Sequence, residues 1–306
     1  MSAISDEQAQ RLRERIGRIG VWLGSIGLLP ADEERRAVAR IEQLGYGVAW
    51  YGEGHANREA LAHGALLLQA SDRLLVASGI ANIWARDAAA AINGANTLNE
   101  GYAGRFLLGL GVSHAPLVEV RGHDYAKPLT AMRRYLEAIH EHRYAAPAPE
   151  EPSPFLIAAL RPRMLELARE RTAGAHPYFV PPAHTAKARE ALGPGPILAP
   201  EQVVVLETMP SRARELGRRH MAGYLKLPNY VNNLRDLGYN DADFADGGSQ
   251  RLLDAIVAWG SEKAIVGRVR EHLDAGADHV AVQAYAENAN TALAQLEQLA
   301  PALLEL

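Results

Sequence analysis

The chain has 306 residues, of which 48% are hydrophobic and 22% charged, and its formal net charge is −4. The small net charge and the lack of a basic block argue against a nucleic-acid partner. The chain contains no cysteine, which excludes disulfides, thiolate nucleophiles and Cys-ligated metals. No apolar stretch reaches the roughly 20 residues of a membrane span, and residues 1–17 form a polar, charged extension. We therefore predict a cytoplasmic protein without a membrane segment, whose N-terminal extension is helical.

Hydrophobic runs and helical periodicity alternate along the chain. The predicted strands cover residues 18–23, 47–51, 74–77, 105–110, 154–159, 175–180, 197–207 and 279–283. The predicted helices cover 31–44, 58–70, 86–100, 128–142, 162–172, 184–192, the region from 211 to about 273, and 291–303. Residues 144–154 read as a surface loop, and residues 224–249 as a helical insertion between the seventh and eighth strands.

Eight strands that alternate with helices favour a parallel sheet covered on both faces. In about 300 residues this pattern predicts a single (β/α)8 TIM-barrel domain over residues 1–306. The alternative is a doubly wound sheet, for which a G-x-G-x-x-G motif is expected after the first strand. The sequence there is LGSIGLLP instead, so we favour the barrel.

Residues 73–87, RLLVASGIANIWARD, are the most informative stretch of the chain. A short apolar strand runs into an apolar loop marked by Gly79, and a helix follows near Arg86. A buried strand that ends in such a loop is how α/β enzymes bring their backbone close to a ligand.

In a barrel, the functional site lies at the carboxyl ends of the strands. The fourth strand leads into Gly111, Val112, Ser113 and His114. His114 would stand at the mouth, where an imidazole that titrates near working pH can move a proton. After the second strand, Glu53 and His55 can form an acid/base pair or a solvated surface loop.

The loops after the fifth and sixth strands offer an anion site. Arg161 and Arg163 open a helix, where guanidinium groups and free N–H groups can hold an anion, although Pro162 also suits an ordinary helix start. His176 ends a strand and is either a site residue or a buried core histidine. His140 and His142 do not share a helix face, so no metal site is predicted.

Taken together, these segments resemble the luciferase-like monooxygenase superfamily, in particular its coenzyme F420-dependent oxidoreductases. The resemblance rests on IGVWLGS, GVAWYGEGHANREAL, LLVASGIANIWARD, GRFLLGLGVSHAPLV, RPRMLELARERTAGAHPYFV and EHLDAGADHVAVQ. It implies a TIM barrel with an insertion after the seventh strand, often a homodimer. It also implies a non-proline cis peptide, here Gly79–Ile80, in a bulge behind the deazaflavin ring.

The resemblance further implies site residues. Cofactor contacts would come from Gly79, Ile80, Ala81, Asn82, Gly111, Val112, Ser113, Arg161, Arg163, Met164, Gly174, Ala175 and His176. The substrate pocket would include Trp22, Trp84, Tyr178, Asn229 and Asn233. The family's acidic residue followed by His after the second strand is replaced here by Glu53-Gly54-His55, and the Glu of many relatives after the fourth strand by His114.

The predicted activity is hydride transfer between the deazaflavin C5 of F420 and a small organic substrate. His114 would donate or accept the proton, with Glu53 or His55 assisting. One alternative is an FMN-dependent monooxygenase on the same barrel. Another is a barrel that binds a cofactor without catalysing a reaction.

Overall fold

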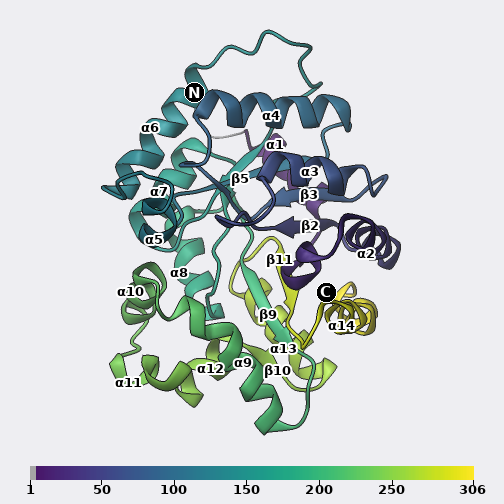
Figure 1. The fold of residues 1–306 in the computed structure, drawn as a ribbon, viewed down its shortest axis with the longest axis vertical. Helices are drawn as coiled ribbons and strands as arrows, with labels where there is room; N and C mark the ends of the chain where they lie inside the picture. Colours follow the sequence, from purple (N-terminus) through teal and green to yellow (C-terminus); the bar gives the residue numbers. More distant parts are fainter. Residues whose placement is uncertain (1–4) are drawn as a thin grey trace.

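In the computed structural model, which describes residues 5–306, a curled parallel sheet lies at the centre and helices surround it (Figure 1). The strands are β1 (Ile19–Trp22), β2 (Val48–Tyr51), β3 (Leu75–Ser78), β4 (Ala81–Asn82), β5 (Phe106–Gly111), β6 (Phe155–Ile157), β7 (Gly174–Ala175), β8 (Ile197–Leu198), β9 (Glu201–Val205), β10 (Ala258–Trp259) and β11 (Val280–Ala284). Their order in the sheet is β10-β9-β11-β1-β2-β3-β5-β6-β7-β8, and β4 pairs with β5.

The helices follow the strands along the chain, as the alternating pattern predicts. They are α1 (Asp6–Ile16), η1 (Gly24–Leu28), α2 (Ala31–Leu44), α3 (Ala60–Leu68), α4 (Ala88–Gly101), α5 (Ala115–Glu119), α6 (Pro128–Glu141), α7 (Pro162–Arg171), α8 (Pro182–Leu192), α9 (Pro210–Tyr224), α10 (Pro228–Asp236), α11 (Asp241–Phe244), η2 (Ala245–Gly247), α12 (Gln250–Ile256), α13 (Glu262–Asp274) and α14 (Ala289–Leu303). The predicted helical extension at 1–17 corresponds to α1, while residues 1–4 lie outside the described part.

Three predicted strands and helices need correction. The strand expected at 175–180 is only the two-residue β7, because Pro177 has no N–H for a ladder and Phe179 takes a φ of 59°. The strand expected at 197–207 is two strands, β8 and β9, separated by Ala199 and Pro200. The region expected to be helical from 211 to about 273 also contains β10.

The break at Pro200 lets one segment contact both ends of the curled sheet. β8 pairs with β7, and β9 pairs with β11. Between them, the Ala199 N–H donates to Ala175 O, and Pro200 O accepts from the Ala281 N–H. Within residues 5–306 the sheet therefore has 11 strands and not the eight expected.

Alternate residues of the strands enter different parts of the core. Val48 and Trp50 of β2 pack inside the curl with Leu12 and Ile16 of α1, whereas neighbouring Ala49 packs outward against the helices. This period of two is what a strand covered on both faces requires. A third cluster joins α9, α10 and α12 below the sheet (Figure 1). The segment 224–249, predicted as an insertion, is helical here, with α10, α11 and η2.

Candidate functional site

A cavity of about 1300 Å³ lies at the edge of the sheet where the parallel strands end. Its wall takes residues from the ends of β1, β2, β3, β5, β6, β7 and β11, including Trp22 at the end of β1, Gly79 after β3, His114 after β5 and His176 after β7. Carboxyl ends of parallel strands meet at one edge, so residues far apart in sequence are brought together there.

The structure sorts the predicted site residues into two groups. Those that line the cavity are Trp22, Glu53, Gly79, Ile80, Val112, Ser113, His114, Arg161, Arg163, Met164, His176, Tyr178 and Asn229. Those outside its lining are His55, Ala81, Asn82, Trp84, Gly111, Gly174, Ala175 and Asn233. The roles of the first group remain predictions, and several of the second have structural reasons for their positions.

The loop after β3 forms a bulge that passes close to β5. The Gly79–Ile80 bond is cis, as the resemblance implied. A Cβ on Gly109 would lie 1.9 Å from Ser78 O, and one on Gly111 would lie 2.3 Å from the Ile80 side chain. These β5 glycines therefore make room for the bulge. For Gly111 the space that a Cβ would take is filled by Ile80, and its predicted contact with a cofactor stays a prediction.

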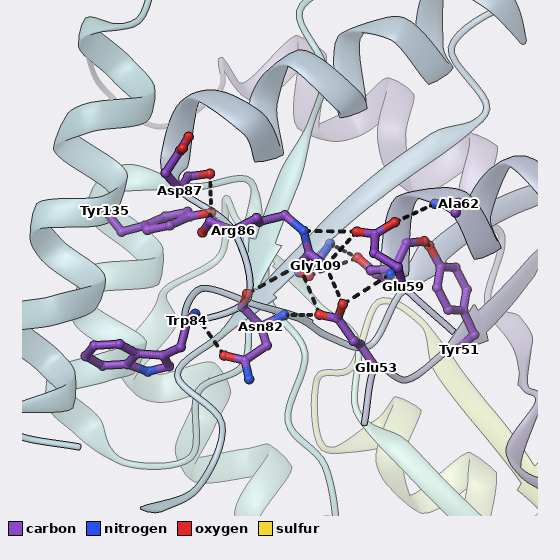
Figure 2. A network of polar contacts seen from close by, with 12 residues as sticks. Tyr51, Glu53, Glu59, Ala62, Asn82, Trp84, Arg86, Asp87, Gly109 and Tyr135 are labelled. Carbon is purple, nitrogen blue, oxygen red and sulfur yellow. Dashed lines mark hydrogen bonds and ion pairs between the residues drawn. The ribbon is translucent and has the colours of Figure 1, made fainter. Parts of the chain in front are cut away.

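Glu53 holds this bulge in place through a buried network (Figure 2). Its carboxylate pairs with Arg86 in two bonds, one of them 3.0 Å long between Oε2 and Nη1. It also accepts N–H bonds from Asn82 (2.7 Å) and Ala60 (3.2 Å). Burial lowers the pKa of Arg86, but the bonds to Glu53 and Glu59 outweigh it and raise that pKa. The guanidinium is therefore permanently charged.

The predicted Glu53–His55 acid/base pair is not formed. The Glu53 oxygens are occupied by Arg86 and by backbone N–H groups. His55 is exposed and lies outside the cavity lining. The intervening Gly54 carries the histidine away from the strand end, so its departure from the family's acidic-residue–His pattern has a structural consequence.

Trp84 and Asn82 also help to hold the bulge after β3 in place. The Asn82 side chain accepts the Trp84 N–H at 3.0 Å (Figure 2). The Trp84 indole donates to Val112 O at 3.0 Å. Trp84 thus ties the bulge to the end of β5 and does not face the cavity. Gly174 also has a packing role, since a Cβ there would lie 2.0 Å from Ile197 O of β8.

His114 lines the cavity without a hydrogen-bond partner at Nδ1 in the described part of the chain. Burial lowers the pKa of His114 to about 4. The imidazole is therefore neutral near pH 7, and the titration near working pH that the sequence suggested does not apply. A neutral imidazole can still accept a proton or share a hydrogen bond.

His176 is both a core residue and a cavity residue. Its ring stacks on Trp50 at 4.3 Å between centroids, and Nδ1 bonds Ala199 O at 2.7 Å. Burial lowers the pKa of His176 to about 4. With Nδ1 donating to a carbonyl, Nε2 carries a lone pair, and this atom has no partner among residues 5–306.

Gly79 lies close to two buried nitrogen atoms that have no hydrogen-bond partner among the described residues. A Cβ at this position would lie 2.9 Å from His176 Nε2 and 3.0 Å from Trp22 Nε1. The Trp22 indole N–H also has no hydrogen-bond partner among the described residues. A buried donor and a buried acceptor thus face the same glycine at the cavity wall. Because native structures rarely leave such atoms unbonded, a ligand or ordered water is expected there.

Trp22 packs against Tyr178 with ring centroids 5.4 Å apart, and Tyr178 belongs to an aromatic wall of the cavity, which we define as Tyr178, His220, Tyr224, Tyr230 and Tyr285. The Tyr178 hydroxyl donates to Gln283 Oε1 at 2.8 Å and lies 2.7 Å from the Tyr224 hydroxyl. Burial raises the pKa of Tyr224 to about 12 and lowers the pKa of His220 to about 3. The wall is therefore uncharged near neutral pH.

Of the five residues of this wall, only Tyr178 was predicted from the sequence to line the pocket. His220 and Tyr224 are four residues apart on α9, so a helix reading of 210–224 would have placed them on one face. Tyr230 lies on α10 within the segment expected to shape the pocket, where Asn229 and Asn233 were named instead. Asn229 lines the cavity, whereas Asn233 is buried outside its lining.

The two arginines after β6 are exposed at the cavity edge. Arg161 Nε donates to Asp236 Oδ2 at 2.9 Å, a contact that is more than half exposed on both sides. Arg163 is exposed as well. Both stand at the start of α7, where Pro162 has no N–H and the Met164 N–H donates to Arg161 O, so the Arg163 N–H is the one without a partner among the described residues. Within residues 5–306 no group of side chains has the arrangement of a metal site, and no helix could cross a membrane.

A parallel sheet covered by helices, with a cavity at the ends of its strands, defines an α/β protein. A family model described as luciferase-like monooxygenase matches residues 16–279, and this chain belongs to that family.

A curated protein similar to this chain matches only part of it. The 5,10-methylenetetrahydromethanopterin reductase of Methanolobus tindarius is 28% identical over 98 residues, which are 32% of this chain and 30% of that protein. The chain thus matches less than a third of that relative's length.

Two solved structures share the fold at low sequence identity. An F420-dependent secondary alcohol dehydrogenase in complex with an F420–acetone adduct has a TM-score of 0.71 at 14% identity, over 94% of this chain and 98% of that one. The oxygenating constituent of 3,6-diketocamphane monooxygenase from Pseudomonas putida, in complex with FMN, has a TM-score of 0.69 at 14% identity, over 94% and 98%. At these identities the likeness shows the fold alone.

Proposed function

We propose that this chain is an F420-dependent oxidoreductase that transfers a hydride between the deazaflavin C5 and a small organic substrate. The curled sheet would be the TIM barrel of that class, and residues 224–249 its insertion. The observation that carries the proposal is the pair of unpaired buried atoms, Trp22 Nε1 and His176 Nε2, on the cavity wall beside Gly79.

The cavity residues fit such a cofactor. A flat ring with carbonyl and N–H groups would satisfy both unpaired nitrogens and lie against the glycine-lined bulge, where no side chain projects at position 79. Arg161 and Arg163, with the first turn of α7, would hold the anionic tail at the exposed edge of the cavity. Their exposure leaves the guanidinium groups accessible to phosphate.

When bound, the deazaflavin supplies a hydride-accepting or hydride-donating carbon. The protein's own part is to orient the two reactants, exclude water and handle the proton. The aromatic wall is uncharged and would cover a small uncharged substrate. His114, neutral and unpaired at Nδ1, would hydrogen-bond to the substrate or take its proton.

The His114 role is tested by His114→Ala. We expect turnover, measured as F420 reduction with a panel of small alcohols, to fall about 10²-fold. Cofactor affinity, measured by fluorescence titration of F420, should change far less. His140→Ala, on α6 and outside the cavity lining, is the control. Unchanged turnover would remove His114 from the mechanism.

The second candidate is an FMN-dependent monooxygenase, supported by the FMN-bound neighbour of the same fold. The two candidates are separated by titrating the purified protein with F420 and with FMN. Micromolar binding of F420 alone supports the main proposal, and micromolar binding of FMN alone overturns it.

A third candidate binds a cofactor without catalysis. It predicts no hydride exchange with any alcohol of the panel and normal cofactor binding in His114→Ala.

We also propose that the protein is a cytoplasmic homodimer. Light scattering on purified protein that gives the monomer mass would refute the dimer.

A further inference from the structure

A buried cluster of Glu34, Arg58 and His63 lies beneath one end of the cavity. Glu34, on α2, is fully buried, and His63, on α3, is 4% exposed. The Glu34 carboxylate bonds His63 Nε2 through Oε1 at 2.6 Å and accepts from Arg58 Nη1 through Oε2 at 2.8 Å. Arg58 also donates to Gly27 O and Leu29 O, at 2.8 and 2.6 Å. The cluster therefore joins α2, α3 and the loop that contains η1.

These contacts fix which nitrogen of His63 carries the proton. Arg58 is the counter-ion of Glu34, and a carboxylate oxygen accepts hydrogen bonds, so His63 is the donor of the 2.6 Å contact. Nε2 then carries the proton, and in a neutral imidazole the lone pair lies on Nδ1. No residue in the described part of the chain bonds Nδ1, and the His63 ring lines the cavity.

The arrangement distinguishes His63 from the other histidines of the cavity. His114 and His220 have no carboxylate partner among the described residues, and His176 is bonded to a backbone carbonyl. Only His63, among the described cavity histidines, has a carboxylate that orients the ring and stabilises an imidazolium. A base within reach of the ligand, oriented by a carboxylate behind it, is the arrangement that general-base catalysis uses.

The His63 ring is also fixed by packing against an aromatic neighbour. Tyr51 packs against it with centroids 4.6 Å apart, and the Tyr51 hydroxyl is engaged with Ala60 O. The ring therefore has few alternative orientations, and it lines the cavity near Gly27, where an added Cβ would lie 3.8 Å from His63 Cε1.

We propose that His63 Nδ1 is a proton-accepting site for an O–H or N–H group of the molecule bound in the cavity, and that Glu34 is its positioning residue. In the transfer, the O–H or N–H bond of the ligand breaks, its electron pair stays on the ligand, and a new N–H bond forms at Nδ1. The resulting imidazolium is stabilised by the Glu34 carboxylate. The inference rests on the proposed function and deepens it, because it names a second proton-handling residue and a ligand class with a hydrogen-bond donor.

The first test measures the ring tautomer of His63 in the cofactor-free protein by long-range ¹H–¹⁵N NMR. His63→Gln identifies the resonances by their loss. We expect Nε2 to be protonated and Nδ1 not; a ring protonated at Nδ1 alone would contradict the proposal. This measurement uses the unaltered protein, so it does not depend on a variant that folds.

Glu34→Gln tests the positioning role. Because Arg58 requires an acceptor, the new amide oxygen should face Arg58 and its N–H should face Nε2. The His63 proton should then move to Nδ1. Glu190→Gln, a change on α8 far along the chain from this cluster, is the control and should leave the tautomer unchanged. An unchanged tautomer in Glu34→Gln would refute the positioning role.

The third test adds 4-nitrophenol, an O–H donor, to the cofactor-free protein. The His63 Nδ1 resonance should move toward its protonated value, while the resonances of His140, outside the cavity, stay constant. An Nδ1 resonance that does not move at saturating probe counts against the proposal. Because no cofactor is present, a failed F420 titration would overturn the proposed function without affecting this result.

The loaded enzyme provides a separate comparison. His63→Gln should lower kcat with the alcohol panel about 10²-fold while the affinity for F420 stays within a few-fold. His140→Gln should change neither. A loss of F420 affinity that equals the loss in kcat would show a structural role for His63 and overturn the proposal.

Discussion

Two parts of the molecule around the cavity, called here the bonded and the unbonded side, differ in how their polar atoms are bonded. Around the Glu53 carboxylate, Glu53, Arg86 and Asn82 form a network in which each charged group has partners (Figure 2). Beside Gly79 and along the aromatic wall, polar atoms of Trp22, His176 and His220 are buried without partners among the described residues. Buried polar groups that remain unbonded cost free energy, so a ligand or an ordered water that bonds them would be stabilising. We propose that the unbonded side binds the ligand, whereas the bonded side maintains the fold.

The largest expected effect on stability comes from a substitution in the bonded side. Arg86→Met leaves the 3%-exposed Glu53 carboxylate without its counter-ion. We expect the free energy of unfolding to fall by about 3–5 kcal/mol in urea denaturation. Arg40→Met, which removes an exposed pair with Glu297, is the control and should cost at most about 1 kcal/mol. Equal losses in the two variants would mean that the network is no more than a surface ion pair.

The next effect concerns Glu201, a buried residue below the aromatic wall. Oε2 accepts the Phe179 N–H at 3.3 Å, while Oε1 has no partner among the described residues. Burial raises the pKa of Glu201 to about 8 from its usual value of 4.5. The folded protein thus holds this proton where the unfolded chain releases it. Stability from this group is complete below pH 4.5 and is lost as the pH rises toward 8.

Glu201→Gln should remove that loss. Between pH 6 and pH 8 the unfolding free energy of the variant relative to the unaltered protein should increase by about 2 kcal/mol. Using the difference between the two proteins cancels the titration of the histidines. Glu190→Gln, on the outer helix α8, is the control and should show a difference independent of pH. A flat difference for Glu201→Gln as well would mean that Glu201 is ionised in the fold.

The smallest effect tests the unbonded side. His220 Nε2 is buried without a partner in the described part of the chain, and burial lowers the pKa of His220 to about 3. His220→Phe removes this unbonded group from an aromatic cluster, so we expect the unfolding free energy to rise by about 1 kcal/mol. Thermal denaturation of the ligand-free protein measures it. A clear loss of stability would show that the Nε2 atom has a structural partner, and would weaken the contrast between the two sides.

Local patterns predicted much of the fold, because regular helices and buried strands carry their own signals. Residues 31–44 were predicted as a helix, and α2 has those bounds. The split of residues 197–207 into β8 and β9 could not be read from apolar runs, since both strands are largely apolar and only Ala199 and Pro200 separate them. The two-residue β10 is too short to give a periodic pattern.

The site was predicted unevenly for a physical reason. Residues directly after a strand, such as Gly79, His114 and His176, can be placed from the strand that precedes them. His63 and Glu34 lie inside helices, and nothing in the spacing of 34 and 63 indicates that α2 and α3 bring them to 2.6 Å. Glu53 was placed at the cavity, but its partner Arg86 comes from the far side of the bulge, so its bonded state required the structure.

The pairing of β1 with β11 has a consequence for how the chain is made. Ile19 pairs with Val280, so the first strand waits for a neighbour that leaves the ribosome some 260 residues later. Until then, β1 presents an open backbone edge of the kind that recruits other chains. Pairings this distant in sequence also form slowly. The β1 edge that pairs with β11 therefore stays unpaired until residue 280 has been synthesised, and an unpaired strand edge of this kind favours association with other chains.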